Sequence, residues 1–175
     1  MARYGLCGTQ SSGKSTLINE LAKLHEFKDY YIATERSKYL RDMGVKLNTD
    51  STINGQFAFA SERSLELMNE NLLTDRSIYD VCSYTLSAES IDWYDKRRLV
   101  EAFVTLVDQY DVIFYVSPEG VEIENNGVRE TNSEYRNKID YTIRELLAEY
   151  PPKQLFTLKG SVEDRIKQVR SYLSL

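Results

Sequence analysis

The stretch GTQSSGKST, residues 8–16, combines two glycines, a lysine and small hydroxyl side chains directly after the apolar run YGLC. It fits the pattern G-x-x-x-x-G-K-[ST], in which glycines let the backbone wrap around an oxyanion and turn successive amide N–H groups inward. The positive end of a following helix dipole adds to that attraction. We therefore predict a phosphate-binding loop formed by Gly8, Gln10, Ser11, Ser12, Gly13, Lys14, Ser15 and Thr16.

Three side chains of this loop have distinct expected roles. Lys14 would reach the β- and γ-phosphates of a nucleotide as a compact point charge. The Ser15 hydroxyl would be a ligand of Mg²⁺, and Thr16 would contact the α-phosphate or cap the helix locally. The alternative is a chance Gly/Ser-rich turn, but the strand before the motif and the helix after it favour a nucleotide site.

Charged residues follow two further predicted strands. Asp75 comes after the run NLLT, where it could hold Mg²⁺ opposite Ser15, and Arg76 could clamp a phosphate. Glu35 ends the second strand and could accept the proton of an attacking hydroxyl. The structural alternatives are a helix-capping Asp75 with an ion-paired Arg76, and a Glu35 that only favours a helix dipole. Asp80 is interpreted as part of the first turn of the next helix.

The segment NNGVRETNSEYR, which ends at Arg136, is polar and rich in turn residues. It follows the strongest predicted strand, DVIFYV, and we expect a lid over about residues 119–136. Arg129 and Arg136 could close over the phosphates, exclude water and supply charge to the transferring group. The alternative is an ordinary connection whose arginines pair with Glu130 and Glu134.

Strand-like and helix-like segments alternate along the chain, which indicates one α/β domain over residues 1–175. The predicted strands are 3–7, 30–33, 71–74, 111–116 and 154–158. The predicted helices are 14–24, 37–44, 56–69, 79–86, 93–109, 133–150 and 161–173. The strands lack polar alternation, so we expect a parallel sheet with helices on both faces and a ligand beyond the carboxyl ends of the strands. In the helix over 56–69, the apolar positions are Phe57, Ala60, Leu65 and Met68.

Composition narrows the classes of function. The net charge is -5 and the isoelectric point about 5.1, which argues against a broad basic surface for duplex DNA but leaves room for a local basic cleft. Cys7 and Cys82 are expected to be buried free thiols, and no motif resembles a zinc site. We find no apolar stretch long enough to cross a membrane and no signal peptide before the loop, so we expect a cytoplasmic protein.

The motifs GTQSSGKST, TER, LLTDRSIYDVCSY and NNGVRETNSEYRNKID occur in this order over nearly the whole chain. Together they resemble the small P-loop kinases related to nicotinamide riboside kinase domains and to thymidylate and deoxynucleoside kinases, a group with an AAA-type ATP-binding domain that also occurs in bacteriophages. The resemblance implies a three-layer P-loop fold with a five-stranded parallel sheet and a short lid. It also implies that Asp75 serves the Mg²⁺ site, Arg76 the phosphates, Glu35 the proton transfer, and Arg129 and Arg136 the lid.

From these residues and this resemblance we predict an ATP- and Mg²⁺-dependent enzyme that moves the γ-phosphate to a nucleoside, nucleotide or related small acceptor. One alternative is a kinase that acts on 5-hydroxymethyluracil in DNA, in the host cytoplasm if the protein is encoded by a phage. The other is a nucleotide-dependent switch, against which the chain lacks a guanine-reading Asn/Thr-Lys-x-Asp motif. A homodimer stays open. Lys14→Ala is expected to abolish transfer and to leave the fold intact.

Overall fold

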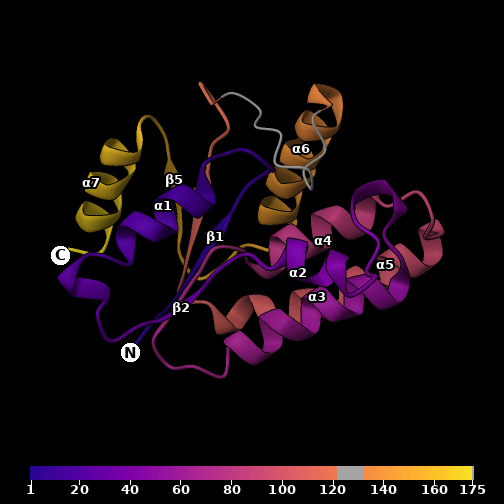
Figure 1. Cartoon of the computed structure of the whole chain (residues 1–175), viewed down its shortest axis with the longest axis horizontal. Helices are drawn as coiled ribbons and strands as arrows, with labels where there is room; N and C mark the ends of the chain where they lie inside the picture. Colours follow the sequence, from indigo (N-terminus) through magenta and orange to yellow (C-terminus); the bar gives the residue numbers. More distant parts are fainter. Residues whose placement is uncertain (122–131, 175) are drawn as a thin grey trace.

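The computed structural model describes residues 1–121 and 132–174. At its centre is one sheet of five parallel strands in the order β2-β3-β1-β4-β5 (Figure 1). The strands are β1 (Arg3–Cys7), β2 (Tyr31–Ala33), β3 (Leu72–Thr74), β4 (Val112–Val116) and β5 (Leu155–Leu158). The prediction of a five-stranded parallel sheet in an α/β fold is confirmed, and each strand lies within one residue of its expected bounds.

Helices cover both faces of this sheet, as expected for three layers. They are α1 (Lys14–Leu21), α2 (Ser37–Asp42), α3 (Ile53–Glu66), α4 (Ile78–Ser87), α5 (Trp93–Phe103), α6 (Ser133–Glu149) and α7 (Val162–Tyr172). Short 3₁₀ turns lie at His25–Phe27, Asn48–Asp50 and Val104–Gln109. Figure 1 shows α1 and α7 together on one side of the sheet and α3 to α6 on the other. Within the described residues, no helix combines the length and the apolar composition needed to cross a bilayer.

Neighbouring side chains of the central strands enter two separate hydrophobic clusters. Leu6 and Phe114 pack in the cluster that contains residues of α1 and α7. Cys7 and Ile113 pack in the cluster that contains residues of α4, α5 and α6. Because successive strand residues point to opposite faces, both faces of the sheet are buried, which is why β4 has no polar alternation. Cys82 also lies in the second cluster, and both cysteines are buried free thiols as expected.

The register of the sheet brings the strand ends of the predicted site together. Gly5 of β1 pairs with Thr74 of β3, and Ala33 of β2 pairs with the same Thr74. On the other side of β1, Cys7 pairs with Tyr115 of β4. The segments that follow β1, β2, β3 and β4 therefore leave the sheet at one edge, where the loop after β1 lies between the ends of its two neighbours.

The inward face of α3 differs from the prediction. Ala60 is buried, but Phe57, Leu65 and Met68 are exposed, Met68 by 77%. The face that turns toward α4 carries polar residues instead, among them the buried Gln56. Of the four apolar positions named from the sequence, only Ala60 therefore faces the core, because part of the inner face of this helix lines a polar cavity. The helix also begins at Ile53, three residues earlier than expected, where the Thr52 side chain accepts from the Gly55 amide.

Candidate functional site

The loop between β1 and α1 has a backbone that only glycine fits at two positions. A Cβ atom on Gly8 would lie 2.6 Å from the Val116 carbonyl oxygen, and one on Gly13 would lie 2.9 Å from the Arg165 guanidinium. Gly13 also has φ of 86°, in the left-handed region that side chains disfavour. These two glycines are the fixed glycines of the phosphate-loop pattern, so close approach of backbone and neighbouring groups explains both.

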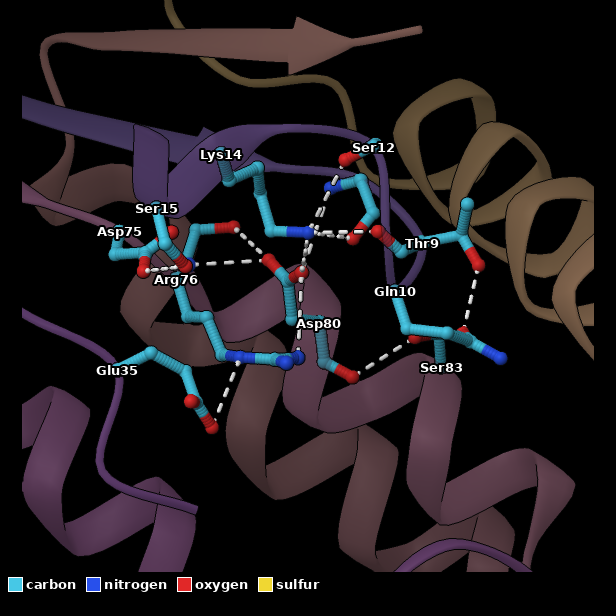
Figure 2. A network of polar contacts seen from close by, with 12 residues as sticks. Thr9, Gln10, Ser12, Lys14, Ser15, Glu35, Asp75, Arg76, Asp80 and Ser83 are labelled. Atoms are coloured by element: carbon cyan, nitrogen blue, oxygen red, sulfur yellow. Dashed lines mark hydrogen bonds and ion pairs between the residues drawn. The ribbon is translucent and has the colours of Figure 1, made fainter. Parts of the chain in front are cut away.

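Lys14 begins α1 and points back into the loop (Figure 2). Its ammonium donates to the carbonyl oxygens of Gly8 and Thr9, the latter at 2.8 Å, and the side chain is 5% exposed. It also lies 3.8 Å from the carboxylate of Asp80. Burial lowers the pKa of Lys14, while the nearby Asp80 acts in the opposite direction. The loop and the carboxylate together hold this cation where the motif requires a phosphate-binding charge.

Ser15 and Asp75 meet across the end of the sheet. The Ser15 hydroxyl donates to Oδ2 of Asp75 at 2.8 Å (Figure 2). Asp75 is 1% exposed, and its other oxygen, Oδ1, is buried without a hydrogen-bond partner among the described residues. An unsatisfied buried carboxylate oxygen beside a hydroxyl suits a hard cation such as Mg²⁺, which prefers oxygen ligands.

The same two residues limit the kind of metal that fits. In the described part of the chain, no three His, Cys, Asp or Glu side chains gather in a way that could hold a metal ion. A site with one carboxylate and one hydroxyl must be completed by water or by substrate oxygens. This is the usual arrangement for Mg²⁺ bound with a nucleotide, so the residues present fit that group.

Arg76 and Glu35 stand on the other side of Asp75, where β2 and β3 end. Nε of Arg76 lies 3.7 Å from the Glu35 carboxylate, and its guanidinium lies 5.5 Å from the centre of the Tyr84 ring. Glu35 also accepts the Ser37 amide at 2.8 Å, at the start of α2. Glu35 therefore contacts the start of α2, as in the structural alternative, and also lies beside the partly buried Arg76.

A cavity of about 320 Å³ opens beside these residues. Its lining combines charged and amide side chains with aromatic and apolar ones, contributed mainly by the segments around α2, α3 and α4. The lining includes Gln10, Glu35, Ser51, Gln56, Phe59, Arg63, Arg76, Asp80, Val81 and Tyr84. A mixed lining of this size is typical of a small-molecule site. Of the predicted site residues, Gln10, Glu35 and Arg76 reach the cavity.

Two lining residues of α3 are buried in a polar network that the sequence analysis did not assign to the site. Gln56 donates to the Ser51 hydroxyl and accepts from the Thr85 hydroxyl at 3.0 Å. Arg63 is 2% exposed and pairs with Glu66, whose carboxyl accepts from Thr74 at the end of β3. The spacing of seven residues between Gln56 and Arg63 puts them on one helical face, and that polar face was the available signal.

The predicted lid arginines have different outcomes. Arg136 lies in the first turn of α6, where its Nη2 donates to the carbonyl oxygens of Ser11 and Pro118 at 3.0 and 3.2 Å. Arg136 is thus in contact with the phosphate-binding loop, and burial lowers its pKa. Arg129 and most of the predicted lid lie outside the described residues.

Arg165 of α7 supports the loop from the opposite face of the sheet and was not predicted as a site residue. It is 1% exposed, and it donates to the carbonyl oxygens of Ser12 at 2.6 Å and Ser117 at 3.0 Å. Its guanidinium also occupies the space that a side chain at position 13 would need. A contact across 153 residues of sequence has no local signal, which is why only the structure reveals it.

Asp80 is the other residue that the sequence analysis placed only in a helix. It does lie in the first turn of α4, as expected. It is also 1% exposed and accepts the Gly8 amide at 3.3 Å, while its carboxylate lies 3.9 Å from Arg76. The structure therefore brings together the loop, Lys14, Asp75, Arg76 and Glu35, with Asp80 between them.

Comparison with known proteins gives a family and a fold. Residues 3–165 match the family AAA_28, described as an AAA domain. Deoxyadenosine kinase from M. mycoides with products dCMP and dCDP bound has a TM-score of 0.64 at 19% identity, over 98% of both chains. NadR protein in complex with NAD and AMP-PNP has a TM-score of 0.70 at 17% identity, over 99% of this chain and 50% of that chain. No curated protein matches the sequence.

Proposed function

The chain belongs to the AAA domain family AAA_28, a P-loop family, and on that basis we propose that it is an ATP-dependent kinase for a nucleoside, nucleotide or related small acceptor. One observation carries the proposal. A cavity of small-molecule size adjoins the phosphate-binding loop and shares Gln10, Arg76 and Asp80 with it or with its immediate contacts. Transfer between two substrates requires two adjoining sites, whereas hydrolysis or switching requires only the first.

The likeness in fold supports the same reading. Solved structures of this fold include a deoxyadenosine kinase with dCMP and dCDP bound and NadR in complex with NAD and AMP-PNP, so both hold nucleotides. At 17 to 19% identity these similarities concern the fold. The acceptor of this chain therefore follows from its own cavity, whose aromatic and amide lining suits a nucleobase.

In the proposed mechanism the donor phosphates lie in the loop, where backbone amides and the Lys14 ammonium bind their oxygens. Ser15 and Asp75 would hold Mg²⁺, which supplies charge neutralisation on the phosphate oxygens when it is bound. Arg76, which is partly buried between Asp80 and the cavity, would bind the transferring group and stabilise its negative charge. These groups act by position and charge, which is what phosphoryl transfer asks of a protein.

Glu35 would orient the acceptor hydroxyl and take its proton as the new P–O bond forms. Its carboxylate is half-buried, lines the cavity and is fixed from two sides, by the Ser37 amide and by Arg76. A general base must be held within reach of the proton that it removes. Arg136 and Arg129 would add charge at the lid end, as the resemblance to P-loop kinases implies.

The test uses purified protein, radiolabelled ATP, Mg²⁺ and an acceptor panel. The panel contains ribo- and deoxyribonucleosides, their monophosphates and an oligonucleotide with 5-hydroxymethyluracil. We expect label in a small-molecule acceptor. Label that appears only in the oligonucleotide would establish the DNA alternative, and label that appears only as free phosphate would contradict a kinase.

A further inference from the structure

Two helices of this protein begin with the same capping box. In α4, Oδ2 of Asp80 accepts the Ser77 amide at 3.1 Å and the Ser77 hydroxyl at 3.3 Å. In α7, Oδ2 of Asp164 accepts the Ser161 amide at 3.2 Å and the Ser161 hydroxyl at 2.8 Å. The two aspartates therefore cap their helices in the same way, each through its Oδ2 atom.

The second oxygen distinguishes them. Oδ1 of Asp80 accepts the Gly8 amide at 3.3 Å and lies 3.8 Å from Nζ of Lys14 and 3.9 Å from Nη1 of Arg76 (Figure 2). The Asp164 side chain is exposed, and in the part of the chain that the structure describes no cation lies within 4 Å of it. The hydrogen bonds of the Asp164 side chain within the described residues are thus those of the cap, whereas Asp80 also contacts the phosphate-binding loop and two cations.

Burial sharpens this difference. A carboxylate that is 1% exposed loses most of its hydration, which is unfavourable unless charged or hydrogen-bonding groups compensate for it. Burial raises the pKa of Asp80, and the charges of Lys14 and Arg76 oppose that rise. Because Asp164 caps its helix from the surface, capping alone does not require a buried aspartate. The burial of Asp80 is explained by its contacts with Lys14 and Arg76.

The two cations belong to different parts of the site. Lys14 is part of the donor loop, and Arg76 lines the cavity proposed for the acceptor. Asp80 also lines that cavity and is bonded to the first glycine of the loop. A single rigid carboxylate, fixed by its helix cap, thus lies between the donor side and the acceptor side.

We propose that Asp80 is a positioning residue that fixes Lys14 and Arg76 relative to each other, so that donor and acceptor meet in register. The proposal rests on the proposed kinase function. Since Asp80 is an anion beside the sites for phosphate, its charge opposes binding of the donor while it orders the groups that act in the transition state. Removing the charge of Asp80 should therefore lower kcat without weakening the Kd for the nucleotide.

The experiment compares Asp80→Asn with the matched control Asp164→Asn. Asparagine keeps the size and one oxygen for the cap. Asp80→Asn should lower the melting temperature more than Asp164→Asn does, because it leaves the buried Lys14 without its carboxylate partner. For Asp80→Asn we expect kcat to fall by about tenfold or more, while the Kd for AMP-PNP with Mg²⁺ stays within about threefold of wild type or becomes tighter. Asp164→Asn should keep the wild-type kcat and Kd.

Three outcomes would overturn the proposal. The first is a wild-type kcat in Asp80→Asn. The second is an equal loss of kcat in Asp164→Asn. The third is a Kd for AMP-PNP that weakens by tenfold or more in Asp80→Asn, because that would place Asp80 in ground-state binding. If Asp80→Asn does not fold, Asp80→Glu keeps the charge but displaces it by one methylene, and an unchanged kcat in that variant would contradict positioning.

The two proposals can fail separately. If no acceptor in the panel takes a phosphate, the kinase assignment fails in the wild-type protein, before any variant is compared. The Kd for AMP-PNP with Mg²⁺ still measures the effect of Asp80 on the donor site. If the wild type transfers phosphate and Asp80→Asn does so equally well, the kinase assignment stands and only the role of Asp80 is lost.

Discussion

The Lys14 ammonium is hydrogen-bonded by its own loop and also lies where it could bind a phosphate. Its ammonium donates to the carbonyl oxygens of Gly8 and Thr9 and is close to Asp80, all within a buried environment. Truncation would therefore remove a ligand-binding charge and also leave two carbonyls and a carboxylate with less compensation. Buried groups that lose their partners are costly, so this residue contributes to stability as well as to function.

For Lys14→Met we expect phosphate transfer to fall by at least about 100-fold, because the charge on the β- and γ-phosphates is lost. We also expect the free energy of unfolding to decrease by about 1–3 kcal/mol. This second expectation differs from the intact fold that the sequence alone suggested for Lys14→Ala, because the structure shows Lys14 buried and bonded. Radiolabel transfer and thermal unfolding followed by circular dichroism measure the two effects, and wild-type transfer would count against the assignment.

Asp75 tests the metal site. Asp75→Asn keeps an oxygen for the Ser15 hydroxyl but removes the charge of the buried carboxylate. We expect the Mg²⁺ concentration for half-maximal activity to rise by roughly 10–100-fold, and the unfolding temperature without metal to change little or to increase. A Mg²⁺ titration of activity checks this, and an unchanged midpoint would show that Asp75 only serves the hydrogen bond to Ser15.

At the scale of elements, two arginines from distant helices shape the phosphate-binding loop. Arg136 of α6 bonds the Ser11 carbonyl, and Arg165 of α7 bonds the Ser12 carbonyl. The loop connects β1 to α1 and is bonded by helices more than one hundred residues later in the chain. Consecutive carbonyls held in this way fix the turn of the backbone between them, so the shape of the donor site depends on the docking of both helices.

Arg165→Met tests that dependence. The change leaves the carbonyl oxygens of Ser12 and Ser117 without their buried donor, and we expect a loss of about 1–3 kcal/mol of unfolding free energy together with weaker nucleotide binding. The matched control is Arg170→Met on the same helix. Arg170 is 49% exposed and pairs with Glu26, so that change should stay within about 0.5 kcal/mol. Equal effects of the two substitutions, by thermal melts, would contradict a specific role for Arg165.

The elements themselves were largely predictable from local pattern. Apolar runs such as 111–116 have no polar alternation, and strands buried on both faces need none, so the strands and their parallel arrangement were recognisable. The failure at α3 has a physical reason. Phe57, Leu65 and Met68 stand at spacings that favour an apolar inner face, but the helix turns Gln56 and its neighbours inward to line a cavity. Hydrophobic periodicity assumes that the inner face meets a core.

The site was predictable where one residue carries its own signal. The phosphate loop has a motif, and Glu35, Asp75 and Arg76 stand at strand ends, which the topology then brings together. Asp80 was interpreted as part of the first turn of its helix, and that interpretation was right but incomplete. Its second set of contacts reaches the loop across 72 residues, and no sequence spacing reports a contact of that kind.

At the scale of the whole molecule, the phosphate-binding loop and the cavity lie side by side at one edge of the sheet. The loop lies at the centre of the sheet edge, after β1, and the cavity lies to the side formed by α2, α3 and α4. The chain has a net charge of -5, and its cavity has the size of a small-molecule site. This combination favours a diffusible acceptor that enters the cavity beside the nucleotide.

Two phenylalanines of α3 test the separation of the sites. Phe59 lines the cavity, whereas Phe57 is 49% exposed, packs against Phe103 of α5 and does not line the cavity. We expect Phe59→Ala to raise the KM for the acceptor by about tenfold with an unchanged Kd for AMP-PNP and Mg²⁺, because one wall of the cavity is lost. Phe57→Ala should change neither. A parallel rise in both variants, measured by steady-state kinetics, would mean that helix stability and not the cavity sets the KM.

The central claim is that residues 8–16 bind the phosphates of a nucleoside triphosphate together with magnesium. Isothermal titration calorimetry of the wild-type protein with AMP-PNP and Mg²⁺ measures this directly, without an acceptor. We predict association at a single site with a Kd of about 1 μM to 1 mM, the range typical of enzyme substrates, and no measurable heat for Lys14→Met. The absence of heat for the wild-type protein with AMP-PNP and with every common nucleoside triphosphate would contradict the account.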